Sequence, residues 1–212
     1  MTASSTRLPR RSSRSVVRAD TADLDVLSRV IADAFCDLAP SQWRVPALEA
    51  RRRVLPGYFR LCLADALAHG IVCTTPSRTA AALWLPIGAE GPVTDPGYGP
   101  RLAAAAGPFA QRFESFDEVL GRHHPTGTGH HHLAILAVRP DRQGQGIGSA
   151  LLRAHHATLD QAGTPVYLEA SDLHTRRFYL TCGYTDHGPP IHLPDGPLMY
   201  PLWRHKPLAL AE

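Results

Sequence analysis

The order of apolar segments predicts one domain of the α+β class, with a mixed sheet flanked by helices. Three observations carry this prediction. The chain has 212 residues, and a domain usually has about 100–200. Hydrophobic residues make up 44% of it, which suffices for a folded core. Helical and alternating patterns then follow one another as strand, two helices, two strands, a long insertion, strand, helix, strand, helix and two closing strands.

Composition excludes several classes of protein. No apolar run approaches the roughly 18 residues that span a bilayer, and a net charge of +3 is too small to indicate nucleic-acid binding. The cysteines are scattered without C-x-x-C spacing, at Cys36, Cys62, Cys73 and Cys182. This pattern fits a reducing compartment rather than a disulfide framework or a zinc site. We therefore expect a cytoplasmic protein with neither a nucleic-acid nor a membrane partner.

The two ends of the chain are expected to lie outside the fold. Residues 1–14 are rich in Ser, Arg and Thr and contain no acidic residue, which predicts a disordered arm. The same composition resembles an organellar transit peptide, although it lacks a sustained apolar face. The single domain is expected over residues 15–205, and residues 206–212 form a tail.

The first half of the domain is expected to hold two helices and three strands. The boundaries follow the Gly and Pro positions and the turn signals between the apolar runs. The expected elements are a strand at Ser15–Ala19, a helix from Thr21 or Asp23 to Asp37, a break at Pro40–Pro46, a helix at Leu48–His69 interrupted by Pro56 and Gly57, and a hairpin of Ile71–Thr74 with Ala80–Leu85.

An insertion of about residues 88–129 precedes the fourth strand. Its ends are rich in Gly and Pro, and Phe109, Phe113, Phe116 and Leu120 recur on one helical face in its middle. A connection this long is either a functional elaboration or a lid over the core.

The second half is expected to alternate strands and helices. Its apolar runs are bounded by Gly163 and Gly183, which end helices. The expected elements are a buried strand at His130–Val138, a loop at Arg139–Gly148, a helix from Ile147 to about Gln161, a strand at Pro165–Ala170, a helix at Thr175–Cys182, and closing strands at Tyr184–Asp186 and Leu198–Trp203.

A glycine-rich loop follows the buried strand, in the segment L-A-V-R-P-D-R-Q-G-Q-G-I-G-S-A-L-L. Gly144, Gly146 and Gly148 let backbone N–H groups face a ligand, and a helix begins directly after them, which predicts a pyrophosphate site. The spacing is not the G-x-G-x-x-G of dinucleotide-binding proteins, and the segment has no lysine for a Walker A motif.

The motif Gln143-x-x-Gly146-x-Gly148 resembles the Q/R-x-x-G-x-G/A signature of the GNAT acetyltransferases, the GCN5-related N-acetyltransferases. F-Y-L-T-C-G-Y at Phe178–Tyr184 resembles that family's fourth helix. The resemblance spans Val16–Trp203 and is strongest over His130–Tyr184. The insertion and the closing segment are similar to those of puromycin N-acetyltransferase-type enzymes. The resemblance implies a mostly antiparallel sheet of about six or seven strands.

The resemblance implies acetyl-CoA as the acetyl-donor cosubstrate. Its pantetheine arm would pair with the backbone of the buried strand, and its pyrophosphate would lie on the glycine loop. Many relatives have Asn where this chain has Thr175. The implied cofactor-binding residues are Leu136, Ala137, Val138, Arg142, Gln143, Gly144, Gln145, Gly146, Ile147, Gly148, Ser149 and Thr175.

Amine acetylation needs a base for the ammonium and an acid for the leaving thiolate. The resemblance places His132 as the base, acting directly or through water, and Tyr179 as the acid. His130 shares the strand face of His132 and could extend a relay, whereas His131 faces the other way. We expect Glu169 and His155 to be structural.

Three residues are candidates for the acceptor site: Trp43, Phe113 and His130, with Phe116 as a further apolar wall. Each could equally be a core residue. His123, His124 and the triplet His130–His132 could form a metal cluster or a polar loop end. Adjacent histidines on opposite faces of a strand do not converge, so we expect no metal.

The sequence therefore favours acetyl transfer to the amine of a small molecule, such as an antibiotic-like compound or secondary metabolite. A protein or peptide N-acetyltransferase and a non-catalytic binding module on the same scaffold are the alternatives. The acceptor, the length of the acyl group and the choice between monomer and homodimer are left open.

Overall fold

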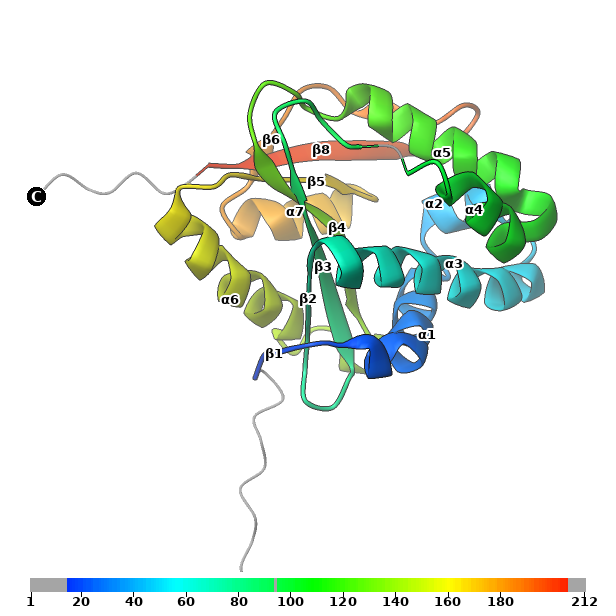
Figure 1. The fold of residues 1–212 in the computed structure, drawn as a ribbon, viewed down its shortest axis with the longest axis horizontal. Coiled ribbons are helices and arrows are strands. Elements are labelled where there is room, and N and C mark those ends of the chain that lie inside the picture. The colour runs from blue at the N-terminus through cyan, green and yellow to red at the C-terminus, as the bar shows by residue number, and fades with distance from the viewer. Residues whose placement is uncertain (1–14, 94, 206–212) are drawn as a thin grey trace, which may run out of the picture.

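A computed structural model describes residues 15–93 and 95–205, so the expected arm and tail lie outside the described residues. The chain forms an eight-stranded sheet of order β1-β2-β3-β4-β5-β8-β6, with β7 paired to β8 (Figure 1). The pairing of β4 with β5 is parallel and the others are antiparallel. The strands are β1 (Val17–Arg18), β2 (Ile71–Thr74), β3 (Ala80–Ile87), β4 (His130–Val138), β5 (Val166–Ala170), β6 (Thr185–Asp186), β7 (Ile191–His192) and β8 (Leu198–Arg204). The α+β class is confirmed.

Helices cover both faces of this sheet. Figure 1 shows α6 on one side of β2–β4 and α1 and α3 on the other. The α-helices are α1 (Leu24–Phe35), α2 (Ala39–Arg44), α3 (Leu48–His69), α4 (Tyr98–Ala106), α5 (Ala110–His123), α6 (Ile147–Ala162) and α7 (Leu173–Thr181), with short 3-10 turns at Thr21–Asp23, Gly107–Phe109 and Pro140–Arg142. Leu83 and Ile135 of the sheet pack with Phe59 on the α3 side. Trp84 and Leu133 pack with Leu151 on the α6 side.

The structure corrects four expectations about elements. Pro56 lies inside α3 without ending it, because Leu55, Phe59 and Leu63 on either side are buried and hold the helix by packing. The expected break at Pro40–Pro46 contains α2, which has a proline in its first turn, where the missing N–H costs nothing. The insertion holds two α-helices, α4 and α5, rather than one, and β7 was not expected.

A β-bulge interrupts β4. Leu83 of β3 lies opposite Ile135 and Trp84 opposite Leu133, so Ala134 has no partner residue. The bulge reverses the side-chain alternation along the strand. Leu136 and Val138 therefore share the α6 face with Leu133, which plain alternation would place on the opposite face.

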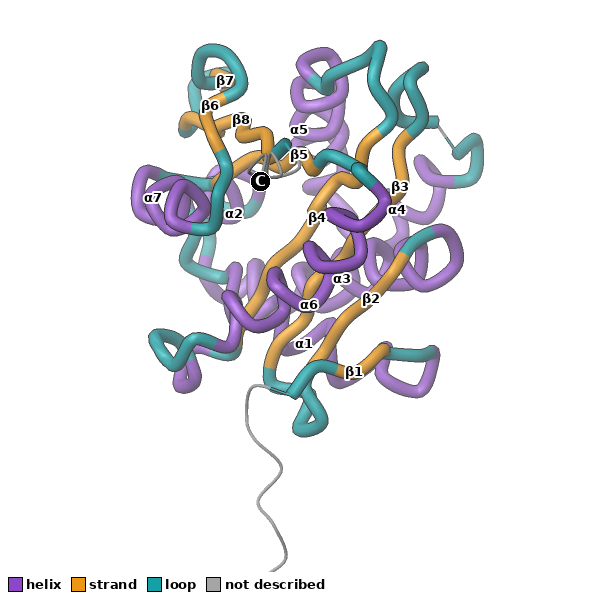
Figure 2. The backbone as a smooth tube through the Cα atoms, turned by 90° about the vertical axis from the view of Figure 1, so that its left-hand side faces the viewer, coloured by secondary structure: helices purple, strands orange, loops and turns teal. Residues whose placement is uncertain are grey.

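The sheet opens between β4 and β5. These strands pair only at His131 with Val166 and His132 with Tyr167, whereas β5 remains paired with β8 along its whole length. Figure 2 shows β4 running away from β5 and β8. Beyond His132, the backbone edge of β4 that would face β5 is therefore not covered by that strand. None of the described helices is long and apolar enough to cross a membrane.

Gly70 allows α3 to end against β3. A Cβ atom at this position would lie 2.1 Å from the carbonyl oxygen of Trp84, and a backbone oxygen in a central strand cannot move aside cheaply. We expect Gly70→Ala to lower the free energy of unfolding by about 2–3 kcal/mol, in the range of overpacked cores. Denaturation by urea measures this effect.

Gly99→Ala is the matched control, because Gly99 lies inside α4 and a Cβ there would meet nothing within 4 Å. It should raise stability by about 0.5–1 kcal/mol, as expected for Gly to Ala in a helix. Equal urea midpoints for the two variants would contradict this account of the end of α3.

Candidate active site

A cavity of about 880 Å³ lies along the open edge of β4. Its size is within the usual range for small-molecule sites, about 300–1,000 Å³. One part is lined by the glycine loop and the start of α6, the middle by β4, β5 and α7, and the other part by α1, α2, α3 and α5. The cavity therefore joins the two regions that the sequence predicts for cofactor and acceptor.

The glycine loop ends in a helix N-terminus that no side chain caps. Gly146 is the N-cap of α6 with φ +74°, and Gly144 has φ +72°, a region that favours glycine. Because the first N–H groups of a helix lack partners within it, they and the positive end of the helix dipole attract an anion. This is the geometry of a phosphate site.

The sequence-predicted cofactor residues come together in the structure. Of these residues, Leu136–Val138, Arg142–Gly144, Gly146–Ser149 and Thr175 line the cavity, and Gln145 does not. The Nε2 group of Gln143 donates to the carbonyl of Val138 at 3.1 Å, which ties the loop to the end of β4. The hydroxyl of Thr175 bonds within the capping box that it forms with Asp172 at the start of α7.

His132 forms a hydrogen bond with a buried carboxylate. Its Nε2 atom lies 2.9 Å from Oε2 of Glu169, and the Glu169 side chain is 5% exposed. Burial opposes ionisation of Glu169, but its interactions with neighbouring side chains, chiefly the hydrogen-bonded His132, outweigh burial and lower the pKa of Glu169 below its usual value. We expected a structural role for Glu169, and the structure places it in direct contact with the candidate base. Alternation along β5 gives no sign of its partner on β4.

Hydrogen bonds fix which ring nitrogens of His130 and His124 carry a proton. Nδ1 of His130 lies 2.8 Å from the carbonyl of Thr128, so it must donate, and Nε2 of His130 must accept. That atom lies 3.0 Å from Nε2 of His124, which therefore donates. Nδ1 of His124 keeps a lone pair and faces Oε1 of Glu169 at 4.0 Å. Burial lowers the pKa of His124 to about 4, so it is neutral near pH 7.

These residues also have the donor set of a metal site. The ligand atoms of His124, His132 and Glu169 all lie within 4.8 Å of one another, and two imidazoles with a carboxylate suit a divalent transition metal. In this structure His132 and Glu169 form a hydrogen bond with each other. The arrangement supports acid–base chemistry without a metal, and the absence of a metal stays a prediction.

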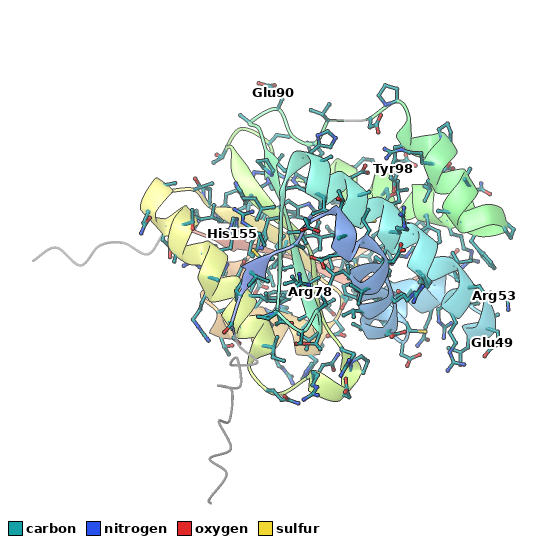
Figure 3. The ribbon with its side chains drawn as sticks, turned by 60° about the horizontal axis from the view of Figure 1, so that its bottom comes forward. Glu49, Arg53, Arg78, Glu90, Tyr98 and His155 are labelled. Atoms are coloured by element: carbon teal, nitrogen blue, oxygen red, sulfur yellow. The ribbon has the colours of Figure 1, made fainter. Side chains whose placement is uncertain are left out.

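Tyr179 lies on α7 and lines the same cavity. It is 9% exposed, and burial raises the pKa of its phenol well above the ordinary value. The hydroxyl therefore holds its proton at neutral pH. His131 lies on the opposite face of β4 from His132, against His155 of α6, as expected. His155 is labelled in Figure 3.

The three candidate acceptor residues do not line the cavity. Phe113 is fully buried in the core, His130 is 2% exposed behind His124, and Trp43 donates its Nε1 hydrogen bond to the carbonyl of Pro194. They support the wall from behind. Sequence reasoning missed the residues that do line this end, chiefly Arg44, Tyr58, Tyr98, Asp117 and Leu120; it had considered Phe116, which also lines it.

Asp117 is a partly buried acid at this end of the cavity. Its Oδ2 accepts a hydrogen bond of 2.6 Å from the hydroxyl of Tyr98, at the start of α4. Tyr98 is labelled in Figure 3. Burial is the main cause that raises the pKa of Asp117 to about 6. Two other acids of α5, Glu114 and Glu118, are exposed.

The raised pKa makes stability depend on pH. Between about 4 and 6 the folded state keeps a proton on Asp117 that the unfolded chain releases, so stability falls as pH rises through this interval. We expect the Tm of Asp117→Asn, taken relative to the Tm of the wild type at the same pH, to rise by about 2–6 °C from pH 4 to pH 7. Thermal denaturation across this range measures it. Glu118→Gln, exposed on the same helix, is the control, and an equal gain there would contradict the assignment.

Residues 112–186 match the family model "Acetyltransferase (GNAT) domain". This range includes the glycine loop, His132, Glu169 and Tyr179. It begins within α5 and ends with β6. The match thus covers the part of the chain in which the sequence resemblance is strongest.

Solved structures are similar over nearly the whole chain. One is a histone acetyltransferase HPA2 and related acetyltransferase from Corynebacterium glutamicum, with 24% identity, a TM-score of 0.68, and 92% of this chain and 98% of that chain covered. Arylalkylamine N-acetyltransferase 2 from Aedes aegypti is 12% identical with a TM-score of 0.60, and the match covers 90% of this chain and 98% of that chain. A polyamine N-acetyltransferase from Drosophila melanogaster is 14% identical with a TM-score of 0.57, and the match covers 90% of this chain and 99% of that chain. The chain thus has the GNAT acetyltransferase fold, and its residues 112–186 match the GNAT domain itself.

Proposed function

We propose that the protein is an acetyl-CoA-dependent N-acetyltransferase that acetylates the amine of a small molecule. One observation carries the proposal. A single cavity joins the uncapped N-terminus of α6, the open edge of β4, the hydrogen-bonded His132 and Glu169, and Tyr179. A phosphate site, a free strand edge and an acid–base pair in one cavity are what direct acetyl transfer requires.

The residues present fit acetyl-CoA. The N–H groups of Gly144 to Ser149 would hold the pyrophosphate, and the backbone of Leu136–Val138 would pair with the amide groups of the pantetheine arm. Acetyl-CoA supplies an activated thioester when bound. The bulge at Ala134 leaves backbone unpaired on the cavity wall, where an N–H group could bind developing negative charge on an oxygen.

His132 would act as the base. A carboxylate only accepts, so Nε2 of His132 donates to Glu169, and Nδ1 keeps the lone pair. That atom would take a proton from the acceptor ammonium, directly or through a water molecule. Glu169 is a positioning residue, because it fixes the tautomer and orientation of the imidazole and stabilises its charged form.

Tyr179 would act as the acid. Because burial raises its pKa, the phenol is protonated at working pH and can donate to a leaving thiolate. Its place on α7, across the opening from β4, separates the acid from the base.

The insertion supports a small acceptor rather than a protein. Tyr98, Phe116, Asp117 and Leu120 come from α4 and α5 and close one side of the cavity. Two of the similar structures are named for arylalkylamines and polyamines, which are small amines. The resemblance to puromycin N-acetyltransferase-type enzymes supports an antibiotic-like amine or a secondary metabolite. Labelling of a peptide library in preference to small amines would instead favour a protein acetyltransferase, and binding without turnover a non-catalytic module.

Calorimetric titration with acetyl-CoA tests the cofactor site. We expect micromolar binding of acetyl-CoA, binding of CoA, and none of NAD. Gly146→Ala should weaken acetyl-CoA binding at least tenfold, because it strains a backbone with φ +74° that presents the N–H groups.

Gly163→Ala is the matched control at the other end of α6. It has φ +68° and no atom within 4 Å of a Cβ, so it shares the strain but lies outside the cavity lining. Its acetyl-CoA affinity should equal that of the wild type. No binding of acetyl-CoA at millimolar concentration would overturn the proposed function.

Steady-state kinetics test the two catalytic roles. His132→Ala and Tyr179→Phe should each lower kcat by about 10²–10⁴ with acetyl-CoA affinity retained, as expected for loss of a general base or acid. Glu169→Gln should lower kcat and displace the pH–rate profile. His131→Gln, on the opposite face, should change neither. Unchanged rates for both His132→Ala and Tyr179→Phe would refute these roles.

A further inference from the structure

Arg44 is a buried cation at the acceptor end of the cavity. It is the last residue of α2 and is 3% exposed. Its Cζ atom lies 5.0, 4.8 and 4.4 Å from the ring centroids of Tyr58, Phe113 and Phe116, so three aromatic rings surround the guanidinium. Such rings stabilise a cation but satisfy none of its N–H donors.

The donors of Arg44 are largely unused. Its Nε group bonds to the carbonyl of Pro40 at 3.3 Å, and its Nη atoms have no hydrogen-bond or ion-pair partner among the described residues. Other buried arginines differ. Arg51 bonds to two carbonyls through Nη1, and Arg204 forms a two-point ion pair with Asp160. Arg44, unlike those two, lines the cavity.

The nearby acids have other partners. Asp117 is bonded by Tyr98 and lies beyond ion-pair distance of Arg44. Its pKa stays raised by burial although Arg44 acts to lower it, so Arg44 compensates it only in part. Asp65, which also lines the cavity, forms an ion pair with Arg101. The guanidinium therefore keeps most of its charge unneutralised within the protein.

An unneutralised buried guanidinium attracts a ligand anion. Arginine stays charged at any working pH, and its planar fork matches a carboxylate in two-point geometry. Taking this charge out of water is costly unless an opposite charge meets it. A single cation among aromatic walls suits a singly charged carboxylate better than a phosphate dianion, which would need further cations.

We propose that Arg44 binds a carboxylate group of the acceptor, so that the substrate is an amino-carboxylic acid whose amino group reaches His132. This inference rests on the proposed function. From Phe116, beside Arg44, the chain advances seven residues along α5 to its end, about 10 Å at the helical rise, and the next residue is His124, beside His132. Phe116 and Leu120 line the path between them and suit an apolar or aromatic spacer.

Matched pairs of acceptors test the proposal on the wild-type protein. The probes are 8-aminooctanoate against 8-aminooctanamide, and 4-(2-aminoethyl)benzoate against its amide, with 1,8-diaminooctane as a third class. We expect kcat/KM for each acid to exceed that of its amide at least tenfold. In Arg44→Gln the ratio should fall to about 1, and Arg44→Lys should retain part of it.

The outcomes separate the two proposals. Equal rates for acid and amide would overturn the role of Arg44 while leaving acetyl transfer intact. A preference for the diamine would do the same and would assign acceptor recognition to Asp117. Calorimetry with the acids in the presence of CoA gives a second readout. Binding lost in Arg44→Gln, with no transfer to any amine, would support the Arg44 site and refute the proposed function. If Arg44→Gln does not fold, as circular dichroism would show, the wild-type pairs decide alone.

Discussion

The separation of β4 from β5 is the constraint on which the rest of the site depends. Two residue pairs join these strands, and β5 then follows β8 instead. A strand edge inside a protein must find hydrogen-bond partners. The cavity along this edge, with the N-terminus of α6 at one end, therefore suits a ligand that carries amide groups and phosphates. The three helices that close the other end, α2, α3 and α5, define the space left for an acceptor.

Glu169 organises the middle of the cavity. It carries a negative charge at a buried position, and only its Oε2 atom has a hydrogen bond. Oε1 faces a lone pair of His124, because the carbonyl of Thr128 sets the tautomers of His130 and His124. The buried hydroxyl of Tyr167 makes the smallest of the contributions that lower the pKa of Glu169. The buried carboxylate thus depends on its hydrogen bond with His132.

Local patterns predicted the elements well where they are regular. The bounds of β2 and β4 follow from apolar runs, and the loop from its glycines. The bulge at Ala134 left no such signal, yet it places His132 on the face of Ile135 rather than that of Leu136. Local patterns also give no sign of side-chain partners that lie far apart in the sequence, and Glu169 lies 37 residues after His132. Trp43 was chosen as an acceptor residue and its neighbour Arg44 was not, because the segment was expected to be a break, and only a helix directs Arg44 toward α3 and α5.

The charges of the cavity follow an order that matches the proposed reaction. The positive end of α6 lies at one end, the carboxylate of Glu169 beside His132 in the middle, and the guanidinium of Arg44 at the other end, where Asp117, bonded by Tyr98, neutralises it only in part. An acceptor ammonium is attracted to the middle, where its proton must be removed, and an acceptor carboxylate to Arg44. The reversed orientation would bring the carboxylate against Glu169 and the ammonium against Arg44. Both contacts would be between like charges in a poorly hydrated space, so the same arrangement selects the orientation in which the amine meets His132.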